Sequence, residues 1–513
     1  MKYAITLLTS LILASLASFG SDAGQPLSIP AQTMPTNGQA VKPPSNSITV
    51  HLEDQVSRMA GGIGASWHCV SHEFTFTNLM KRSQLKARGS AWGGNPPAEQ
   101  EDRWKRMEEL ATWLGMDFMR VELEQNSYEP NRGAFDWDSE EMKALYRILD
   151  WCEKDGVDVF LTQMYANVDW NAYDGVSRVQ SAPKDMNAFA VGLATLVEHL
   201  VKVKHYTCIK WICINNEPTG LWAWWLGPDA KLMSITPGLK AVRAELDKRG
   251  IIIPLSAPDH NSLKALKNGF DFDGYVGAYD CHDYGEPDAH AMKQWADYAR
   301  SKGKPFMITE MGDGRFNRGQ DASGPNSYNH AMSMANKIVL GLNVGVGAFN
   351  RWSFVNRGDI DGQWQLIRTW DRTAKKYLDK EKIEPEPISY YAYGIITRFT
   401  AKHSSVLKTE NSSPEVVSTA LRSPDGNLTF IVVNNSSNEQ SMSISLSGVA
   451  QSPKLYCYQV AEPAVNRPDF QMDPIKQIEI SANKPQFNDQ LPKSSITVYS
   501  TYHLTHADNG ITE

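Results

Sequence analysis

Residues 211–218 read Trp211-Ile212-Cys213-Ile214-Asn215-Asn216-Glu217-Pro218, an apolar run that ends in two amides, a carboxylate and a proline. An uninterrupted apolar run predicts a strand that is buried on both faces, as strands of parallel sheets are. Polar groups directly after such a strand need a reason beyond packing, because the carboxyl ends of parallel barrel strands carry the active site. The stretch therefore predicts one strand of an α/β sheet, with Glu217 at its functional end.

The same alternation of apolar strands and amphipathic helices extends on both sides of this stretch, from about residue 60 to residue 400. In Glu140–Lys154, for example, Met142, Leu145 and Leu149 recur on one helical face. Eight such units predict a (β/α)8 TIM barrel over residues 59–400. A doubly wound sheet is the rival, but no GxGxxG or GxxxxGK[ST] follows the first strand. The predicted strands are Gly62–Ser66, Phe118–Glu122, Val157–Gln163, Ile209–Asn215, Ile251–Ser256, Val276–His282, Phe306–Glu310 and Val344–Asn350.

The two ends of the chain have a different residue pattern from the predicted barrel. Short alternating runs separated by turn residues predict a C-terminal antiparallel β-sandwich domain over residues 401–513. Residues 46–58 alternate as well, and we expect them to form a strand that joins this sandwich. Residues 1–21 combine Lys2, an apolar stretch and small residues, which indicates a cleaved signal peptide, and residues 22–45 resemble a flexible lead-in. We therefore expect a secreted or periplasmic protein.

Composition narrows the range of partners. The formal net charge is −7, with 42% hydrophobic and 21% charged residues, and there is no long basic run. Nucleic acid is a poor candidate partner, because its binding depends on clustered positive charge. No segment after the signal peptide is long and apolar enough to predict a membrane span, and we expect a monomer. The six cysteines are scattered and several lie in apolar runs, which favours free thiols over disulfides.

A second apolar strand that ends in glutamate follows later in the chain. Residues Pro305–Gly312 read Pro-Phe-Met-Ile-Thr-Glu-Met-Gly, with Glu310 at the end of the run. Counting along the predicted barrel, Glu217 and Glu310 follow strands four and seven, whose carboxyl ends face each other across the mouth. One protonated and one ionised carboxyl group so placed can cleave a glycosidic bond, the first as acid and the second as nucleophile. We therefore predict that Glu217 and Glu310 are catalytic.

These strand-end motifs resemble those of the clan A glycoside hydrolases, which are retaining (β/α)8 glycosidases. The resemblance covers about residues 55–400. It implies that Glu217 is the acid/base, that Glu310 is the nucleophile, and that Asn216 binds the sugar 2-hydroxyl. It further implies that Arg120 lies near the nucleophile, that His282 and Tyr284 form a pair whose tyrosine orients the nucleophile, and that Trp352 forms an aromatic floor for the sugar.

Other residues after predicted strands are weaker candidates for lining the cleft. Trp67 and Trp170 are predicted to bind substrate, because flat aromatic faces stack on sugar rings. A metal site is not predicted, because His68 and His72 lack an accompanying HExxH motif, and no cofactor is predicted either. The remaining cleft candidates are His68, Gln163, Asn167, Asp259, His260, Asp313 and Arg315, with Trp222, Trp224 and Trp225 as a platform or a cover for a helix.

Within the clan, the layout resembles family 30 most and family 39 next. The features behind this resemblance are the sandwich, the glycine-rich entry Gly61–Ser66 and the closing run Leu491–Val498. It implies a retaining O-glycosyl hydrolase that cleaves β-glycosidic bonds of a poly- or oligosaccharide. Two alternatives stay open: a transglycosylase that uses the same carboxylate pair, and a non-catalytic carbohydrate-binding barrel. The sugar, the linkage and the choice between endo and exo action do not follow from the sequence.

Overall fold

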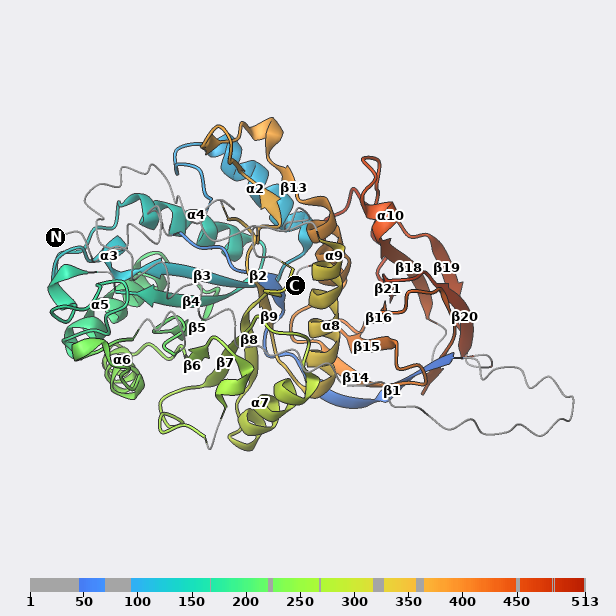
Figure 1. Cartoon of the computed structure of the whole chain (residues 1–513), viewed down its shortest axis with the longest axis horizontal. Helices are drawn as coiled ribbons and strands as arrows, with labels where there is room; N and C mark the ends of the chain where they lie inside the picture. The colour runs from blue at the N-terminus through green and yellow to red at the C-terminus, as the bar shows by residue number, and fades with distance from the viewer. Residues whose placement is uncertain are drawn as a thin grey trace, which may run out of the picture. The chain divides into compact units, whose positions relative to one another are not determined.

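The computed structural model describes residues 46–69, 94–166, 168–219, 225–266, 269–316, 327–356, 364–448, 453–481, 483 and 485–511. The predicted signal peptide and the lead-in up to residue 45 lie outside the described residues. Residues Ser45–Glu513 form one compact unit. It contains an eight-stranded parallel sheet and a nine-stranded sheet, shown in Figure 1.

The parallel sheet is a barrel, which confirms the predicted fold class. Its neighbouring strands follow the order β2-β9-β8-β7-β6-β5-β4-β3. The two ends of this order meet, because Trp67 N–H donates to the Arg120 carbonyl at 2.9 Å and Ser66 forms a parallel bridge with Arg120. The strands are β2 (Ile63–Ala65), β3 (Phe118–Glu124), β4 (Asp158–Tyr165), β5 (Ile209–Cys213), β6 (Leu255–His260), β7 (Ala278–Asp283), β8 (Phe306–Met311) and β9 (Phe349–Arg351).

Helices follow the strands and cover the outside of the barrel. Ser139 caps α4, since its side chain accepts from Met142 N–H at 3.2 Å, and buried residues line the face of α4 that packs on the sheet. The helices are α2 (Glu101–Leu114), α3 (Gln125–Tyr128), α4 (Glu140–Lys154), α5 (Met186–Glu198), α6 (Thr236–Lys248), α7 (Ala289–Ser301), α8 (Tyr328–Val344) and α9 (Pro387–Thr397). Among the described residues, only Met186–Val203 is long and apolar enough to cross a membrane, and half of it is buried inside the molecule.

Two predicted strands begin four or five residues later in the structure than in the sequence analysis. The fifth barrel strand starts at Leu255 instead of Ile251, and the eighth starts at Phe349 instead of Val344. Val344 ends α8, and Gly345 caps that helix in the left-handed conformation with φ of 99°. The apolar character of both stretches is real, but it belongs to the connections that lead into the strands.

The amino-terminal end of the barrel is closed by its own side chains. A cluster of buried residues fills the interior there: Phe118, Phe160, Trp211, Cys213, Ala278, Met307 and Ala348. Glycines allow the first strand to fit tightly, since a Cβ on Gly62 would lie 1.7 Å from Asp117 Oδ1. With this end packed, functional side chains can gather only at the carboxyl ends of the strands.

The second sheet forms the C-terminal sandwich, and the strand closest to the N-terminus belongs to it. β1 (Asn46–Arg58) pairs antiparallel with β14 and parallel with β17, while the other pairs in the sheet are antiparallel. The sheet order is β19-β18-β21-β16-β15-β14-β1-β17-β20. Its remaining strands are β14 (Ser405–Asn411), β15 (Val416–Arg422), β16 (Leu428–Asn434), β17 (Gln440–Ser447), β18 (Lys454–Ala461), β19 (Lys476–Glu479), β20 (Gln486–Leu491) and β21 (Ser495–Ser500).

The sandwich packs directly against the barrel through α8 and α9. Helix α8 contacts β1, β14, β15, β16 and β21, and α9 contacts β18 and β21, as Figure 1 shows. Hydrogen bonds reinforce this packing: Asn343 donates to the Ser418 carbonyl at 2.8 Å, and Tyr328 donates to the Val460 carbonyl at 3.1 Å. The two domains therefore share one interface of helices and strands within a single compact unit.

Candidate active site

The structure brings Glu217 and Glu310 together at the carboxyl ends of the fourth and seventh barrel strands. Glu310 lies in β8, and Glu217 follows β5. Both residues are almost buried, with 8% and 6% of their surface exposed. An oxygen of each carboxyl group and a nitrogen of His282 all lie within 4.8 Å of one another. The two carboxyl groups are thus close enough to act on one bond.

The backbone at Glu217 has an unusual conformation. Its φ is +39°, which is in the left-handed region that non-glycine residues rarely adopt. The Glu217 N–H donates to the Asp259 carbonyl at 3.1 Å, which ties this strained loop to the end of β6. Such strain costs about 1–3 kcal/mol and persists only where the surroundings fix it. The surrounding contacts therefore hold a strained backbone that positions this carboxyl group.

Arg120 joins the two sides of the site. Its side chain is fully buried on β3. Nη1 donates to Glu310 Oε2 at 2.7 Å and also to Glu122, while Nη2 donates to Asn216 Oδ1 at 2.8 Å. The neighbouring negative charges raise the pKa of Arg120 despite its burial. Because the Asn216 oxygen accepts from Arg120, the side-chain amide of Asn216 is held in one orientation.

His282 lies between carboxylates. Its Nδ1 lies 2.8 Å from Glu217 Oε1 and 3.7 Å from Glu310 Oε2, and its Nε2 lies 3.0 Å from Asp259 Oδ1. Burial disfavours a charged imidazole, but the charges on Glu310 and Asp259 outweigh it and raise the pKa of His282 to about 10. With both nitrogens protonated, His282 donates to the carboxyl groups on its two sides.

The nucleophile candidate has a second donor. Tyr284, just after β7, donates its hydroxyl hydrogen to Glu310 Oε1. Its ring packs edge-on against Trp364, with the ring centres 5.4 Å apart. Each oxygen of Glu310 therefore receives a hydrogen bond, one from Tyr284 and one from Arg120. Two such donors hold a carboxylate in one orientation.

The environment of Glu217 favours a protonated carboxyl group. Burial raises the pKa of Glu217, and the negative charges on Glu310 and Asp259 add to this effect. The hydrogen bond and the positive charge of His282 oppose it without reversing it. The two glutamates are both almost buried but have different partners: Glu310 accepts from the cation Arg120 and from Tyr284, whereas Glu217 has His282. This asymmetry suits a pair with one acid and one nucleophile.

The predicted aromatic residues have different positions. Trp352 follows β9 and is almost buried, with its ring centre 5.0 Å from that of His68, and the peptide bond from Trp352 to Ser353 is cis. Trp67 is a correction to the sequence analysis: it has no exposed surface and packs among Trp104, Trp151 and Phe354 in the core. Its apolar bulk serves packing, so it has no face for a substrate.

Trp170 and the weaker candidates are spread over several places. Trp170 is partly exposed beyond β4, and its indole N–H donates to the Glu129 carbonyl at 3.4 Å. Asp259, His68 and Gln163 are fully buried and do not line an open cleft. Asp313 and Arg315 pair with each other after β8, with Arg315 Nη2 2.7 Å from Asp313 Oδ2. Trp225 is buried beside Phe189, and Asn167, Trp222, Trp224 and His72 lie outside the described residues.

Residues that the sequence analysis missed complete the site. Glu122 is fully buried on β3 and contacts Arg120, and Thr309 precedes Glu310 and donates to Asp259 Oδ1 at 3.1 Å. A signal was present for Glu122, since residues two apart in a strand share a face and Arg120 was already a candidate. Asp280 accepts a hydrogen bond from the Asp259 N–H. It lies inside an apolar run of the sequence, so no pattern marked it as a site residue.

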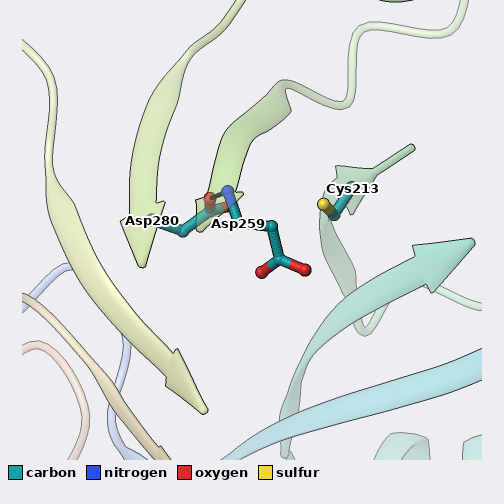
Figure 2. A group of neighbouring side chains, drawn as sticks. All are labelled: Cys213, Asp259 and Asp280. Carbon is teal, nitrogen blue, oxygen red and sulfur yellow. Dashed lines mark hydrogen bonds between the residues drawn. The ribbon is translucent and has the colours of Figure 1, made fainter. Parts of the chain in front are cut away.

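Among the described residues, two groups of side chains have spacing that could suit a metal, but several of their ligand atoms already take part in contacts within the protein. In the first group, Glu217, His282 and Glu310, both His282 nitrogens point at carboxylates and offer no lone pair. Figure 2 shows the second group, Cys213, Asp259 and Asp280, where the strands β5, β6 and β7 end side by side. Both oxygens of Asp259 accept hydrogen bonds from protein donors. In each group, at least one residue is therefore already bonded through both of its possible ligand atoms.

Comparison with known proteins gives a consistent assignment. Residues 74–341, more than half of the chain, match the family model for cellulase (glycosyl hydrolase family 5). Residues 404–498 match the model for the glycosyl hydrolase family 30 beta sandwich domain. No curated protein matches the chain in sequence.

Many solved structures share the fold. A GH30 endoxylanase from Clostridium papyrosolvens C71 is 16% identical, with a TM-score of 0.60 over 88% of this chain and 99% of that one. SrfJ from Salmonella typhimurium is 11% identical, with a TM-score of 0.62 over 91% and 95%. The endo-beta1,6-glucanase BT3312 is 15% identical, with a TM-score of 0.60 over 89% and 94%. At these identities the likeness shows the fold.

The match to the barrel model, the match to the sandwich model and the shared architecture agree with one another. They also agree with the resemblance that the strand-end motifs carry. The chain therefore belongs to the clan A glycoside hydrolases, with a barrel of the glycosyl hydrolase family 5 (cellulase) type and the β-sandwich domain of family 30.

Proposed function

We propose that this chain is a secreted, retaining glycoside hydrolase that cleaves β-glycosidic bonds of a poly- or oligosaccharide, with Glu217 as acid/base and Glu310 as nucleophile. The observation that carries the proposal is the pair itself. An oxygen of Glu217 and an oxygen of Glu310 lie within 4.8 Å of each other. Retaining enzymes have carboxyl groups about 5–5.5 Å apart, whereas inverting enzymes leave about 6.5–9.5 Å for a water molecule.

The first chemical step forms a bond to Glu310. A Glu310 oxygen attacks the anomeric carbon while the bond from that carbon to the leaving oxygen breaks, and Glu217 gives its proton to the leaving oxygen. Arg120 and Tyr284 hold Glu310 for this attack, since each donates to one of its oxygens. The buried Glu217 is suited to carry the proton, because burial raises its pKa.

The second step breaks the bond to Glu310. Once Glu310 is esterified, its negative charge is gone, and that charge is one of the causes that raise the pKa of Glu217. Glu217 then accepts a proton from water, the water oxygen bonds to the anomeric carbon, and the carboxylate of Glu310 is released. Two displacements at the same carbon restore its configuration.

Substitution of the two glutamates tests the assignment. Glu310→Gln removes the nucleophile, and we expect no turnover of an aryl β-glycoside and no rescue by azide. Glu217→Ala removes the acid, so substrates with poor leaving groups should lose most rate, and azide should restore turnover and give a β-glycosyl azide. Glu109→Gln, an exposed change on α2, is the matched control and should keep full activity. Wild-type turnover by Glu310→Gln would refute the assignment.

The substrate class is tested by product analysis. The relatives named above include an endoxylanase and an endo-beta1,6-glucanase, so the panel consists of β-xylan, β-1,6-glucan and cellulose, with mass analysis of the products. A chain that binds one of these glycans without releasing product would be a binding barrel instead. Products longer than the substrate after addition of an acceptor sugar would indicate a transglycosylase.

Export is tested separately from catalysis. The proposed signal peptide covers residues 1–21, with an apolar stretch after Lys2 and small residues at its end. We expect the exported protein to begin close to residue 22 when its N-terminus is sequenced. An intact Met1 in the extracytoplasmic fraction, or retention in the cytoplasm, would contradict export by a cleaved signal.

A further inference from the structure

Asp259 has a central but hidden place in the site. It lies in β6, has no exposed surface, and adopts φ of +55°. Its backbone N–H donates to Asp280 Oδ1 at 2.5 Å. Figure 2 shows the result of this geometry: the backbone of Asp259 faces Asp280, while its carboxylate points away from Asp280. The strained backbone thus directs the carboxylate away from the neighbouring acid.

Both oxygens of the Asp259 carboxylate contact cationic side chains. His282 Nε2 lies 3.0 Å from Oδ1, and Arg120 Nη2 donates to Oδ2 at 2.9 Å. Thr309 adds a third hydrogen bond to Oδ1 at 3.1 Å. Burial alone would raise the pKa of Asp259, but the charges on His282 and Arg120 outweigh it and lower the pKa to about 2. Asp259 is therefore ionised throughout the working range of pH.

These contacts link the two glutamates through one continuous chain of charges. Glu217 contacts His282, His282 contacts Asp259, Asp259 contacts Arg120, and Arg120 contacts Glu310. When Glu310 becomes esterified in the proposed reaction, its negative charge is lost, and that charge is one of the causes that raise the pKa of Glu217. Asp259 contacts both His282 and Arg120 and keeps its own negative charge throughout.

We infer that Asp259 is a positioning residue that keeps His282 charged and pointed at Glu217, and that thereby couples the proton on Glu217 to the state of Glu310. This inference rests on the proposed function for its kinetic consequences. The charge on His282 and its contact with Asp259 do not depend on the proposed function. The substrate does not contact Asp259, since the residue has no exposed surface.

Loss of the negative charge at Asp259 should shift the pKa of Glu217 in a direction that follows from the contacts. In Asp259→Asn, His282 loses an anionic partner of Nε2, so it gives up its proton at a lower pH. Glu217 then loses the nearby cation that holds its pKa down, and also the more distant anion of Asp259 that pushes it up. The cation lies at hydrogen-bond distance and the anion lies beyond the imidazole ring, so the cation dominates. The net effect raises the pKa of Glu217.

Other titratable groups surround His282 and belong to the same balance. Asp280 precedes it on β7, and burial raises the pKa of Asp280 to about 7. Burial lowers the pKa of His260 on β6 to about 4, so it is neutral beside His282. The remaining groups near the chain are Cys213, Cys281, Tyr284 and Glu122, with His68 Nδ1 3.9 Å from Glu122 Oε2. Asp259→Asn keeps these side chains but removes a negative charge that raises the pKa of Asp280, Cys213 and Cys281.

The kinetic test compares Asp259→Asn with a matched buried control. The alkaline limb of kcat/KM on an aryl glycoside with a poor leaving group should move up by about one pH unit in Asp259→Asn. Asp117→Asn alters a fully buried carboxyl group at the opposite end of the barrel, where Asp117 Oδ1 accepts from Ile63 N–H. It should lower the melting temperature without moving the limb. An unmoved limb in folded Asp259→Asn would overturn the inference.

The spectroscopic test does not depend on any activity. In histidine-labelled protein, the two ring nitrogens of His282, assigned by their loss in His282→Gln, should stay protonated up to about pH 9. In Asp259→Asn they should titrate below that pH. A His282 signal that stays charged in Asp259→Asn overturns the inference, whether or not the protein hydrolyses a glycoside. A protein with the expected spectra and no turnover would instead refute the proposed function alone.

A milder variant covers the case in which Asp259→Asn does not fold. Thr309→Val is nearly isosteric and removes one neutral donor to Asp259 Oδ1. The oxygen then accepts more strongly from His282, so the Nε2–H proton resonance should move downfield. An unchanged resonance would show that Asp259 does not control His282, which would overturn the inference.

Discussion

At the scale of single residues, the two glutamates are distinguished by their neighbours and not by their own chemistry. Glu310 has Arg120 and Tyr284 as donors, whereas Glu217 has burial and one shared histidine. The neighbours therefore give two identical side chains different environments. Changes to the neighbours should then act on one glutamate at a time.

The pH dependence of activity should reflect Glu217. Its pKa is raised, so the protonated acid persists above the ordinary range of a glutamate and is lost as pH rises through the raised value. We expect kcat/KM on a substrate with a poor leaving group to fall on the alkaline side for this reason. With Glu217→Ala and an activated leaving group, the alkaline limb should be absent. A limb that survives this substitution would belong to another group.

Removal of the Tyr284 hydroxyl should slow the attack by Glu310. In Tyr284→Phe one Glu310 oxygen loses its donor while the ring and its contact with Trp364 stay. We expect kcat to fall by about 10²-fold with a smaller change in KM, because the hydrogen bond orients the nucleophile. Tyr298→Phe on α7 is the control, since its hydroxyl bonds Asp273 instead. Equal kinetics for both variants would contradict this role.

The sequence predicted the residues at the ends of strands better than the residues between them. Arg120, Asn216, Glu217, His282, Tyr284 and Glu310 were predicted as one site, and the structure brings them together. Trp67 follows a strand as well, but helices α2 and α4 cover it with Trp104 and Trp151. Position along the chain gives no information on what covers a side chain. The role of Asp259 depends on its left-handed backbone, which no sequence pattern indicated.

At the scale of elements, close backbone approach decides where the first strand can lie. In β2, a Cβ on Gly64 would lie 1.6 Å from the Phe118 carbonyl oxygen of β3. No side chain can move to make room, because the obstacle is backbone. The glycine therefore lets the strands that close the barrel come together.

Gly64→Ala should destabilise the protein severely. The added methyl group would push β2 from β3, and we expect a loss of at least about 3 kcal/mol in the free energy of unfolding. Gly274→Ala is the matched control, since a Cβ there meets nothing within 4 Å. Urea unfolding of the two variants gives the comparison. A Gly64→Ala protein as stable as Gly274→Ala would refute the close approach.

The sequence analysis missed elements whose apolar residues have no regular spacing. Strand β14 reads Ser-Val-Leu-Lys-Thr-Glu-Asn, with two adjacent buried residues instead of alternation. Strand β20 is at the edge of its sheet and is largely polar, and the sequence analysis assigned no helix to the apolar stretch that forms α9. These elements are set by partners far along the chain, and local propensity does not encode such partners.

At the scale of the whole molecule, one hydrophobic cluster extends from the barrel into the sandwich, which also has a cluster of its own. A single cluster of buried residues contains barrel residues such as Ile338 and Leu342 together with sandwich residues. The members on the sandwich strands are Val406, Leu421, Ile431, Val433, Tyr458, Val460, Ile496 and Val498. A sandwich that acted as a detachable module would have no such continuity.

Truncation should therefore disrupt the barrel. Removal of residues 401–513 would expose the faces of α8 and α9, and each uncovered apolar side chain costs about 1.5–3 kcal/mol. We expect residues 46–400 to be insoluble, and the full chain to unfold in a single calorimetric transition. Two separate transitions, or a soluble and active truncated barrel, would show that the domains are independent.

The position of β1 has a consequence for the order in which the molecule is made. The Ser47 N–H bonds Ser412 Oγ, a partner 365 positions later in the chain. A ribosome that adds about 5–20 residues per second needs about 20–70 s to make that partner. Until then the apolar Ile48, Val50 and Leu52 have no sheet to enter. The earliest strand to leave the ribosome is among the last to be paired, so conditions that slow elongation prolong the time when this strand can join another nascent chain.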